Sequence, residues 1–290
     1  MKPALSCRND GCAWSEEEAA AGLLRESLPP DAVDGIWRDV RDAAADVASR
    51  EPLLRQRLHR LVLDRSSLAD AIGAILSDRL ASADMSESSL YGLMNEILGE
   101  DDAILLDIVT DMHALKNRDP ACMNHLHGLL NMKGFHALQT YRIAHALWKR
   151  ERRELAFVLS NKSSVVFCVD IHPAARIGCG VMLDHGSGIV IGETAVVDDN
   201  VSILQNVTLG GTGKEHGDRH PKVRCGVMLG AGAKILGNIE IGAMSKVAAG
   251  SVVLEAVPPH CTVAGVPAKI VRWHQRSNMP ALDMDQSVKN

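Results

Sequence analysis

A six-residue repeat in the C-terminal half constrains this chain more than any other feature of its sequence. Large aliphatic residues stand six positions apart after Phe167, a period that matches neither the 3.6 residues of a helix nor the 2 of a strand. Four positions after each aliphatic residue the side chain is often small or β-branched. The aliphatic positions are Ile171, Ile177, Leu183, Ile191, Val197, Ile203, Leu209, Val223, Leu229, Ile235, Ile241, Val247 and Val253.

A hexapeptide repeat of this kind predicts a solenoid in which each repeat forms one short strand and one turn. Three repeats close a triangular coil of about 18 residues, with the aliphatic residues pointing inward and stacking from coil to coil. The number of repeats therefore predicts about four coils. A core of stacked Ile, Val and Leu also explains why only 3% of the residues are aromatic.

The repeat is interrupted twice. The step from Leu183 to Ile191 takes eight residues, and the step from Leu209 to Val223 takes fourteen. The second interruption holds the polar segment GTGKEHGDRHPK (211–222), which cannot belong to a regular coil. Insertions into a solenoid usually carry function, so we expect site residues at both interruptions.

Upstream of the repeat the apolar pattern is helical, with residues such as Ile36, Val40 and Ala44 recurring at three- and four-residue steps. The expected helix N-caps are Ser66 or Ser67, Ser86 and Asp101. The chain therefore divides into a disordered extension (1–30), an α-helical domain (31–160), a β-solenoid (161–272) and a flexible C-terminal tail (273–290).

Composition excludes several classes of function. The net charge of the 290 residues is -5 and no basic block stands out, so we expect no nucleic-acid partner. No apolar run approaches the roughly 18–20 residues of a membrane span, so we expect no membrane association and a cytoplasmic location. Seven cysteines are scattered without a C-x-x-C pair, which favours reduced thiols over a disulfide framework or a structural zinc site.

Several segments carry a family resemblance. They are RDPA (118–121), KGFHALQTYRIAHALW (133–148), VDIHPAARIGCGVMLDHGSGIVIGETAVV (169–197), VSILQNVTLGGTGKEHGDRHPK (201–222), GAGAKILGNIEIG (230–242) and AGVPAKIV (264–271). The chain resembles the hexapeptide-repeat acyltransferases, and the combination of RDPA, VDIHPAA, LDH and GDRHP resembles the serine acetyltransferases in particular. The resemblance spans about residues 33–275. It implies an α+β chain in which an N-terminal α-helical domain precedes a left-handed parallel β-helix.

The resemblance also implies an activity, the transfer of an acetyl group from acetyl-coenzyme A to the hydroxyl of L-serine as the first step of cysteine biosynthesis. His185, in the LDH motif, would be the general base, because imidazole titrates near neutral pH. Its implied partner is Asp170, which lies fifteen residues upstream and would fix the histidine tautomer. Without the resemblance, His185 is equally well explained as a histidine in a surface turn.

The substrate L-serine carries an ammonium group and a carboxylate. By resemblance, Asp119 and Asp184 would bind the ammonium group. Arg219 would bind the carboxylate, which its guanidinium fork suits, and His220 would also contact the substrate. Without the family context, Asp119 is explained as the common Asp-Pro end of a helix.

Coenzyme A, as acetyl-coenzyme A, is the implied cosubstrate, and we expect no metal. The resemblance places it in a groove along neighbouring coils, where Gly211, Ala231 and Ala249 would let the pantetheine arm approach. Lys246 and Lys269 are candidates to meet its phosphates, although both are equally explained as ordinary surface lysines.

The resemblance further implies a homotrimer with active sites between chains, and an oligomerisation domain (31–160) that pairs two trimers into a hexamer. L-Cysteine is an expected feedback inhibitor because it differs from L-serine by one atom. The tail of such enzymes docks into O-acetylserine sulfhydrylase through a terminal isoleucine. Because this sequence ends in Asn290, we expect weak sulfhydrylase binding or none.

Three alternatives stay open at this point. A related hexapeptide acetyltransferase acting on another hydroxyl acceptor, such as a sugar, would keep His185 but would not need Asp119, Asp184 and Arg219. A zinc carbonic anhydrase would need three converging histidines, whereas the close pair His216 and His220 lies in the inserted segment. A scaffold without activity would have no need of this set of polar residues.

Overall fold

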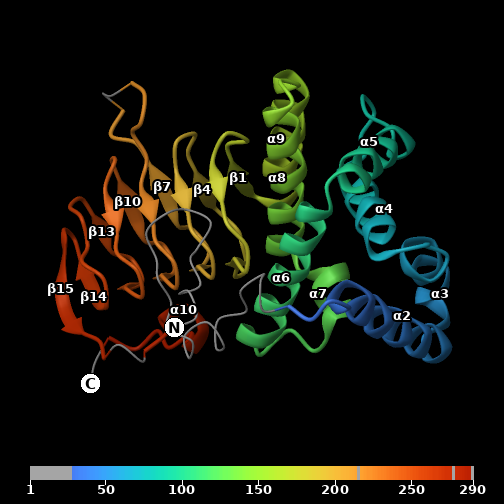
Figure 1. Cartoon of the computed structure of the whole chain (residues 1–290), viewed down its shortest axis with the longest axis horizontal. Coiled ribbons are helices and arrows are strands. Elements are labelled where there is room, and N and C mark those ends of the chain that lie inside the picture. The colour runs from blue at the N-terminus through green and yellow to red at the C-terminus, as the bar shows by residue number, and fades with distance from the viewer. Residues whose placement is uncertain (1–27, 214–215, 276–277, 289–290) are drawn as a thin grey trace.

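The computed structural model describes residues 28–213, 216–275 and 278–288. In these residues a helical part is followed by a parallel β-solenoid, as Figure 1 shows. The predicted α+β arrangement is confirmed. The predicted extension (1–30) lies almost entirely outside the described residues, and Asn290 lies outside them too.

The helical part begins soon after the first described residue and extends further than the sequence predicts. The last long helix ends at Phe167, so the predicted boundary between 160 and 161 falls inside it. The helices are α2 (Ala32–Arg50), α3 (Pro52–Leu58), the π-helical segment η2 (His59–Leu63), α4 (Leu68–Leu80), α5 (Glu87–Glu100), α6 (Asp102–Arg118), α7 (His125–Asn131), α8 (Lys133–Lys149), α9 (Arg153–Phe167) and, near the C-terminus, α10 (Pro280–Asp283).

The three predicted N-caps lie where the sequence places them. The hydroxyl of Ser67 accepts a hydrogen bond from the backbone N–H of the third residue of α4, and Ser86 does the same for α5. The carboxylate of Asp101 accepts from the N–H of Ala103 in α6. Each cap satisfies one of the amide groups that the first turn of a helix leaves without a partner.

The solenoid has three sheets, one along each side of a triangular coil, and their strands are parallel except for the last hairpin. The five-stranded sheet contains β1 (Val169–Ile171), β4 (Ile189–Ile191), β7 (Thr208–Gly210), β10 (Lys234–Leu236) and β13 (Val252–Val253). The four-stranded sheet contains β2 (Arg176–Ile177), β5 (Val196–Val197), β8 (Lys222–Val223) and β11 (Glu240–Ile241). The six-stranded sheet contains β3 (Met182–Leu183), β6 (Ser202–Ile203), β9 (Met228–Leu229), β12 (Lys246–Val247), β14 (Cys261–Gly265) and β15 (Ala268–Trp273).

The register of the strands confirms the hexapeptide interpretation. Val190 pairs with Thr208, and Lys234 pairs with Val252, so a regular coil takes eighteen residues. Between Val169 and Ile189 the coil is two residues longer, which is the first interruption of the repeat. The sheet that begins with β1 has five strands, so the solenoid has about five coils and not four.

One corner of the triangle uses residues with positive φ in coil after coil. The connections from the six-stranded to the five-stranded sheet contain Gly188 (φ 74°), Asn206 (φ 60°), Gly232 (φ 73°) and Gly250 (φ 70°). Glycine adopts this conformation without steric cost, and asparagine tolerates it. A side chain at Gly188 is excluded for a second reason, because its Cβ would lie 2.1 Å from the side-chain oxygen of Asn206.

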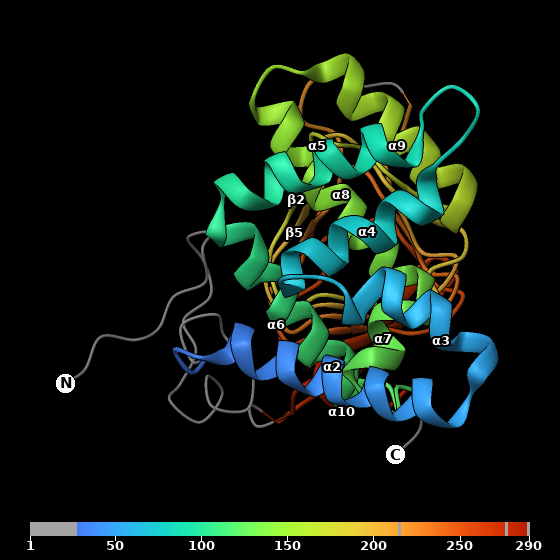
Figure 2. The same ribbon diagram turned by 90° about the vertical axis from the view of Figure 1, so that its right-hand side faces the viewer.

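Helices α2 to α9 lie across one end of the solenoid and are bonded to its first coil (Figure 2). From α8, the hydroxyl of Tyr141 donates to the carbonyl of Ala175 at 2.5 Å, and Arg142 donates to the carbonyl of Gly178 at 2.7 Å. From α6, the buried carboxylate of Asp111 accepts from Arg142 and from the N–H of Val181. These bonds fix the strand that leads into the first interruption.

The C-terminal segment 278–288 lies on the outer face of the six-stranded sheet. The hydroxyl of Ser202 donates to the carbonyl of Ala281, and Met279 packs in one apolar cluster with Cys225 and Met244. Cys225 is disulfide-bonded, so the expectation of reduced thiols is wrong for this residue. The described cysteines Cys122, Cys168, Cys179 and Cys261 are free thiols.

Candidate active site

The first interruption of the repeat forms a tight turn that presents His185. The turn connects β3 to β4, and its two extra residues push the histidine outward, so that 73% of its side chain is exposed. His185 has a φ of 57° and Gly186 a φ of 76°, and the N–H of Gly186 donates to the carbonyl of Asp184 at 2.6 Å. An exposed imidazole on a turn fixed by its backbone is accessible to a substrate.

The first turn of α8 packs against the turn that contains His185. A Cβ at Gly134 would lie 2.1 Å from the carbonyl oxygen of Leu183, so only glycine allows α8 to approach this closely. The ammonium group of Lys133 donates to the hydroxyl of Ser187. Sequence reasoning assigned no role to these two residues. Their position in the quoted KGFHALQ motif was the available signal.

The carboxylate of Asp184 lies beside His185, and that of Asp119 lies close enough to Asp184 to act on its charge. The Oδ1 of Asp184 is 3.7 Å from the Nε2 of His185. Burial raises the pKa of Asp184, and the nearby charge of Asp119 adds to this rise, although His185 opposes it. Asp119 follows the last residue of α6, and its carboxylate accepts from the N–H of Ala121 at 2.8 Å. Two neighbouring carboxylates repel each other, which favours a cation bound between them.

A second group of predicted residues lies around Thr194. The hydroxyl of Thr194 accepts from the backbone N–H groups of Arg219 and His220 at 3.0 and 3.1 Å. The N–H of Thr194 donates to the Nδ1 of His220, which leaves the ring proton on Nε2. Burial lowers the pKa of His220, and the neighbouring Arg219 lowers it further. We therefore expect His220 to be neutral near pH 7.

Two further residues hold this group in place. A Cβ at Gly192 would lie 2.1 Å from the ring of His220, so the imidazole packs directly on the glycine backbone. The guanidinium of Arg219 donates to the carboxylate of Glu193 at 2.6 Å, and this bond lowers the pKa of Glu193. A substrate carboxylate that binds Arg219 must therefore share the guanidinium with Glu193 or displace it. Gly192 and Glu193 lie in the segment GETAVV (192–197), but sequence reasoning assigned them no role.

Asp170 lies in β1 with its side chain exposed, and its partner in the next coil is Val190. Among the residues that the structure describes, no hydrogen bond or ion pair joins Asp170 to His185. Its charge acts instead on His172, whose pKa is lowered by burial while Glu193 and Asp170 oppose that change. The pairing of Asp170 with His185 remains a prediction.

The predicted residues occupy two different corners of the triangular coil. His185, Ala231 and Ala249 lie in connections from the six-stranded to the five-stranded sheet, and the N–H of Gly250 donates to the carbonyl of Ala231. The other corner joins the five-stranded to the four-stranded sheet. Its long β7–β8 connection, which projects from the solenoid in Figure 1, contains Gly211, Arg219 and His220. Within one chain, the predicted site residues are therefore split between two separate corners of the coil.

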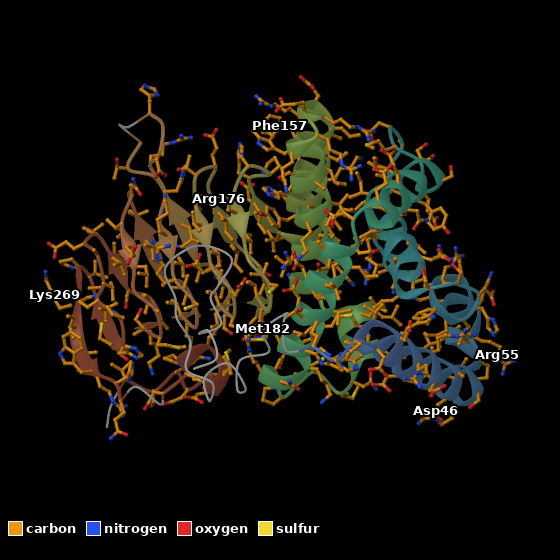
Figure 3. The ribbon with its side chains drawn as sticks, viewed as in Figure 1. Asp46, Arg55, Phe157, Arg176, Met182 and Lys269 are labelled. Carbon is orange, nitrogen blue, oxygen red and sulfur yellow. The ribbon has the colours of Figure 1, made fainter. Side chains whose placement is uncertain are left out.

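The two lysines proposed for coenzyme A lie elsewhere. Lys246 is only 4% exposed, and its ammonium group donates to the backbone carbonyls of Asp285 and Ser287, so segment 278–288 covers it. Burial lowers the pKa of Lys246. Lys269 lies on β15, at the end of the solenoid away from the helices, with its ammonium group 3.7 Å from the carboxylate of Glu255 (Figure 3). With the segment in place, Lys246 cannot contact a ligand.

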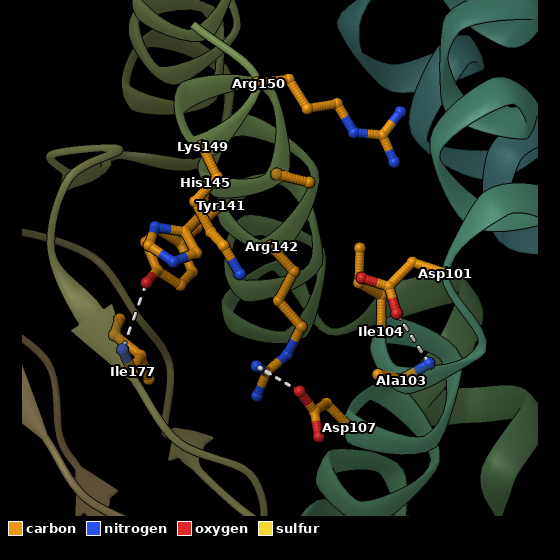
Figure 4. A pocket seen from close by; sticks show the side chains of 11 residues that line it. Asp101, Ala103, Ile104, Asp107, Tyr141, Arg142, His145, Lys149, Arg150 and Ile177 are labelled. Carbon is orange, nitrogen blue, oxygen red and sulfur yellow. Dashed lines mark hydrogen bonds and ion pairs between the residues drawn. The ribbon is translucent and has the colours of Figure 1, made fainter. Parts of the chain in front are cut away.

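A pocket of about 400 Å³ lies between α6, α8 and β2 (Figure 4). Acidic and basic side chains both line it, among them Asp107, Arg142 and Lys149. The Nδ1 of His145, another lining residue, is 2.8 Å from the carbonyl of Pro173. No predicted site residue lines this pocket.

Within the described ranges, no group of three or more His, Cys, Asp or Glu side chains is arranged to hold a metal ion. The helices in the same ranges are too short or too polar to cross a membrane.

The helical part, the β-solenoid and the polar loop inserted into it define the chain as a hexapeptide-repeat acyltransferase. Residues 36–140 match the family model "Serine acetyltransferase, N-terminal". The chain is 51% identical over 259 residues to the serine acetyltransferase of Salmonella typhimurium, which covers 89% of this chain and 94% of that protein. The chain belongs to the serine acetyltransferase family.

Solved structures agree with this assignment. The serine acetyltransferase of Vibrio cholerae superposes with a TM-score of 0.85 at 53% identity, covering 88% of this chain and 98% of that one. A serine acetyltransferase in complex with cysteine has a TM-score of 0.85 at 49% identity, covering 87% and 98%. The enzyme of Brucella abortus in complex with coenzyme A has a TM-score of 0.83 at 48% identity, covering 84% and 98%. The soybean enzyme complexed with serine has a TM-score of 0.82 at 48% identity, covering 84% and 100%.

Proposed function

We propose that this chain transfers the acetyl group of acetyl-coenzyme A to the hydroxyl of L-serine, releasing O-acetyl-L-serine and coenzyme A. The observation that carries the proposal is the exposed imidazole of His185 beside Asp184, whose carboxylate has that of Asp119 as a neighbour. An ammonium group bound between the carboxylates relieves their repulsion and holds the substrate hydroxyl near the histidine. The relatives solved with serine and with coenzyme A support the same substrates here.

The carboxylate of the substrate requires the other corner of the coil. Arg219 provides the guanidinium fork, and the neutral His220 has an Nε2–H to donate. Because this corner is distinct from the corner of His185, we infer that Arg219 and His220 complete the site of a neighbouring subunit. A closed ring of three chains satisfies each site once. The helical part, on the end of the solenoid, would then pair two such trimers.

In the proposed reaction, His185 removes the proton from the hydroxyl as the serine oxygen attacks the thioester carbonyl. The C–O bond forms and the carbonyl becomes a tetrahedral oxyanion. This intermediate collapses, the C–S bond breaks, and the imidazolium returns its proton to the departing thiolate of coenzyme A. Asp170 would stabilise the imidazolium from β1 if substrate or a neighbouring subunit brings the two side chains together.

The cosubstrate would lie along the corner that contains Ala231 and Ala249, with Gly211 in the β7–β8 connection of a neighbouring subunit opposite. Small residues there allow the pantetheine arm to reach backbone amide and carbonyl groups. Lys246 is left out of this proposal, because segment 278–288 covers it. Lys269 remains exposed and could pair with a phosphate.

L-Cysteine fits the same groups, since its ammonium and carboxylate are those of serine. The relative solved with cysteine supports binding of this ligand to the fold. We therefore propose inhibition that is competitive with serine. Inhibition that leaves the apparent affinity for serine unchanged would indicate a separate cysteine site.

Complementation between inactive variants tests both the activity and the shared site. His185→Ala and Arg219→Ala are purified separately and after co-expression, and thiol release from acetyl-coenzyme A is measured with serine, sugars and other hydroxyl acceptors. If each site takes His185 from one chain and Arg219 from the next, random assembly leaves about a quarter of the sites intact. A co-expressed sample no more active than either variant refutes the shared site. A wild-type chain that does not acetylate serine refutes the proposed activity.

A further inference from the structure

Arg118 is the last residue of α6 and directly precedes Asp119. Its side chain contacts the solenoid. Its side chain is buried, and its guanidinium donates three hydrogen bonds. Nη1 donates to the carbonyl of Gly180 at 2.9 Å and to the hydroxyl of Ser202 at 3.2 Å, and Nη2 donates to the side-chain oxygen of Asn200 at 2.9 Å. The acceptors belong to two successive coils, so one side chain connects α6 to both.

The backbone of the β2–β3 and β5–β6 connections positions these acceptors. Gly180 and Asn200 have φ values of 64° and 58°, and the N–H of Asn200 donates to the carbonyl of Cys179. A Cβ at Gly180 would lie 2.6 Å from the side-chain oxygen of Asn200. Gly180 therefore leaves space for the amide that receives the guanidinium.

Burial of the Arg118 guanidinium has a cost in free energy. The hydrogen-bond acceptors of Arg118 are neutral oxygens. Burial lowers its pKa to about 10, although the nearby charge of Asp111 opposes this change, so the residue is still charged near pH 7. Burying a charge against neutral acceptors is energetically demanding, and a leucine at the end of α6 would avoid that penalty. The guanidinium gains directional bonds that fix where the helix ends.

The end of α6 determines the position of Asp119. The N–H of Asp119 still donates to the carbonyl of Leu115 at 3.1 Å, so its backbone continues from the anchored helix. Asp184 precedes the His185 turn in the next part of the same coil as Gly180. Arg118 thus connects the chain segment that carries one carboxylate to the coil that carries the other.

We propose that Arg118 is a positioning residue that holds Asp119 beside Asp184 and thereby sets the affinity for the ammonium group of the amino-acid substrate. The inference rests on the proposed function of this pair. Arg118 does not contact substrate and acts through Asp119.

The test compares Arg118→Met with Arg118→Lys, which keeps the charge but cannot donate to Gly180 and Asn200 in one plane. We expect Arg118→Met to raise the KM for serine and the inhibition constant of cysteine together, roughly 10- to 100-fold, since a displacement of about 1 Å has effects of that size. The KM for acetyl-coenzyme A should stay within about twofold, and Arg118→Lys should fall between.

A double-mutant cycle separates positioning from mere stabilisation. If Arg118 acts through Asp119, Arg118→Met adds little to the KM for serine in an Asp119→Asn background. Equal effects in both backgrounds, or a lower melting temperature with an unchanged KM, overturn the proposal. Arg79→Met is a matched control, because Arg79 donates to the carbonyl of Leu130 within the helical part and should leave the KM for serine unchanged.

If Arg118→Met does not fold, Asn200→Gly removes one acceptor and keeps the backbone conformation with positive φ. The KM for serine should rise in this variant too, and an unchanged value overturns the proposal. The wild-type chain is assayed first. Failure of the wild type to acetylate serine contradicts the proposed function, whereas a wild type that is active together with a silent Arg118→Met contradicts only the role of Arg118.

Discussion

Replacing Gly192 by alanine is expected to disable the His220 corner through a single methyl group. The added Cβ would lie 2.1 Å from both Cδ2 and Nε2 of His220, whereas atoms in contact normally stay about 3.5–4 Å apart. The imidazole must therefore move by more than about 1 Å. The movement breaks its hydrogen bonds with Thr194, whose lengths are 2.9 and 3.2 Å.

The magnitude follows from these contacts. Two lost hydrogen bonds are worth about 1–3 kcal/mol in total, and forcing a methyl into a packed site adds about 1–3 kcal/mol. We expect Gly192→Ala to lower the free energy of unfolding by about 2–6 kcal/mol. If the bonds that orient His220 are also lost in the transition state, kcat/KM for serine falls roughly 10- to 100-fold.

Thiol release at varied serine and varied acetyl-coenzyme A measures the effect, together with thermal unfolding. The matched control is Gly92→Ala in α5, where the same methyl group has nothing within 4 Å. That variant should keep its kinetic constants and gain about 0.5–1 kcal/mol, since alanine favours a helix over glycine. A Gly192→Ala enzyme with wild-type kcat/KM for serine would show that His220 does not depend on its packing against Gly192.

Three further predictions follow from the site. His185→Ala should reduce turnover roughly 10²–10⁴-fold while calorimetry still detects coenzyme A binding, and near-normal turnover would remove this residue from the mechanism. As the pH is lowered, kcat/KM for serine should fall when Asp184 takes up a proton. Because the pKa of Asp184 is raised, this fall should occur at a higher pH than for an ordinary aspartate. Asp119→Asn should shift that limb to lower pH, and a limb that does not move would contradict the proximity of the two groups. Lys246→Met should release segment 278–288, which limited proteolysis would detect as faster cleavage there than in the wild-type chain.

The local pattern of the sequence was enough for much of the fold. The six-residue spacing of Ile, Val and Leu specifies which residue of each repeat points inward, and the uninterrupted coils have the expected eighteen residues. The helix caps Ser67, Ser86 and Asp101 were also predictable, because a cap bonds an amide two or three residues away. The predicted boundary between 160 and 161 falls within α9, which continues to Phe167.

The candidate site was predicted as a set of residues, through motifs, and not as an arrangement. With three repeats to a coil, the spacing places His185 after a third side and Arg219 after a first side, but it does not show how these two corners come together in a site. Asp170 shows the same limit, since a separation of one coil specifies its strand but not the direction of its side chain.

Thus the sequence by itself determined the repeating coil, the helical half and the family, because each is encoded by neighbours within a few positions or by continuous motifs. The tertiary structure decided what depends on residues far apart in the chain. It decided that Arg118 finds its acceptors 62 to 84 positions away, that Gly134 must be small because of Leu183, and that Lys246 lies beneath the C-terminal segment. These pairings arise only when the folded coil brings the segments together, and no local periodicity records them.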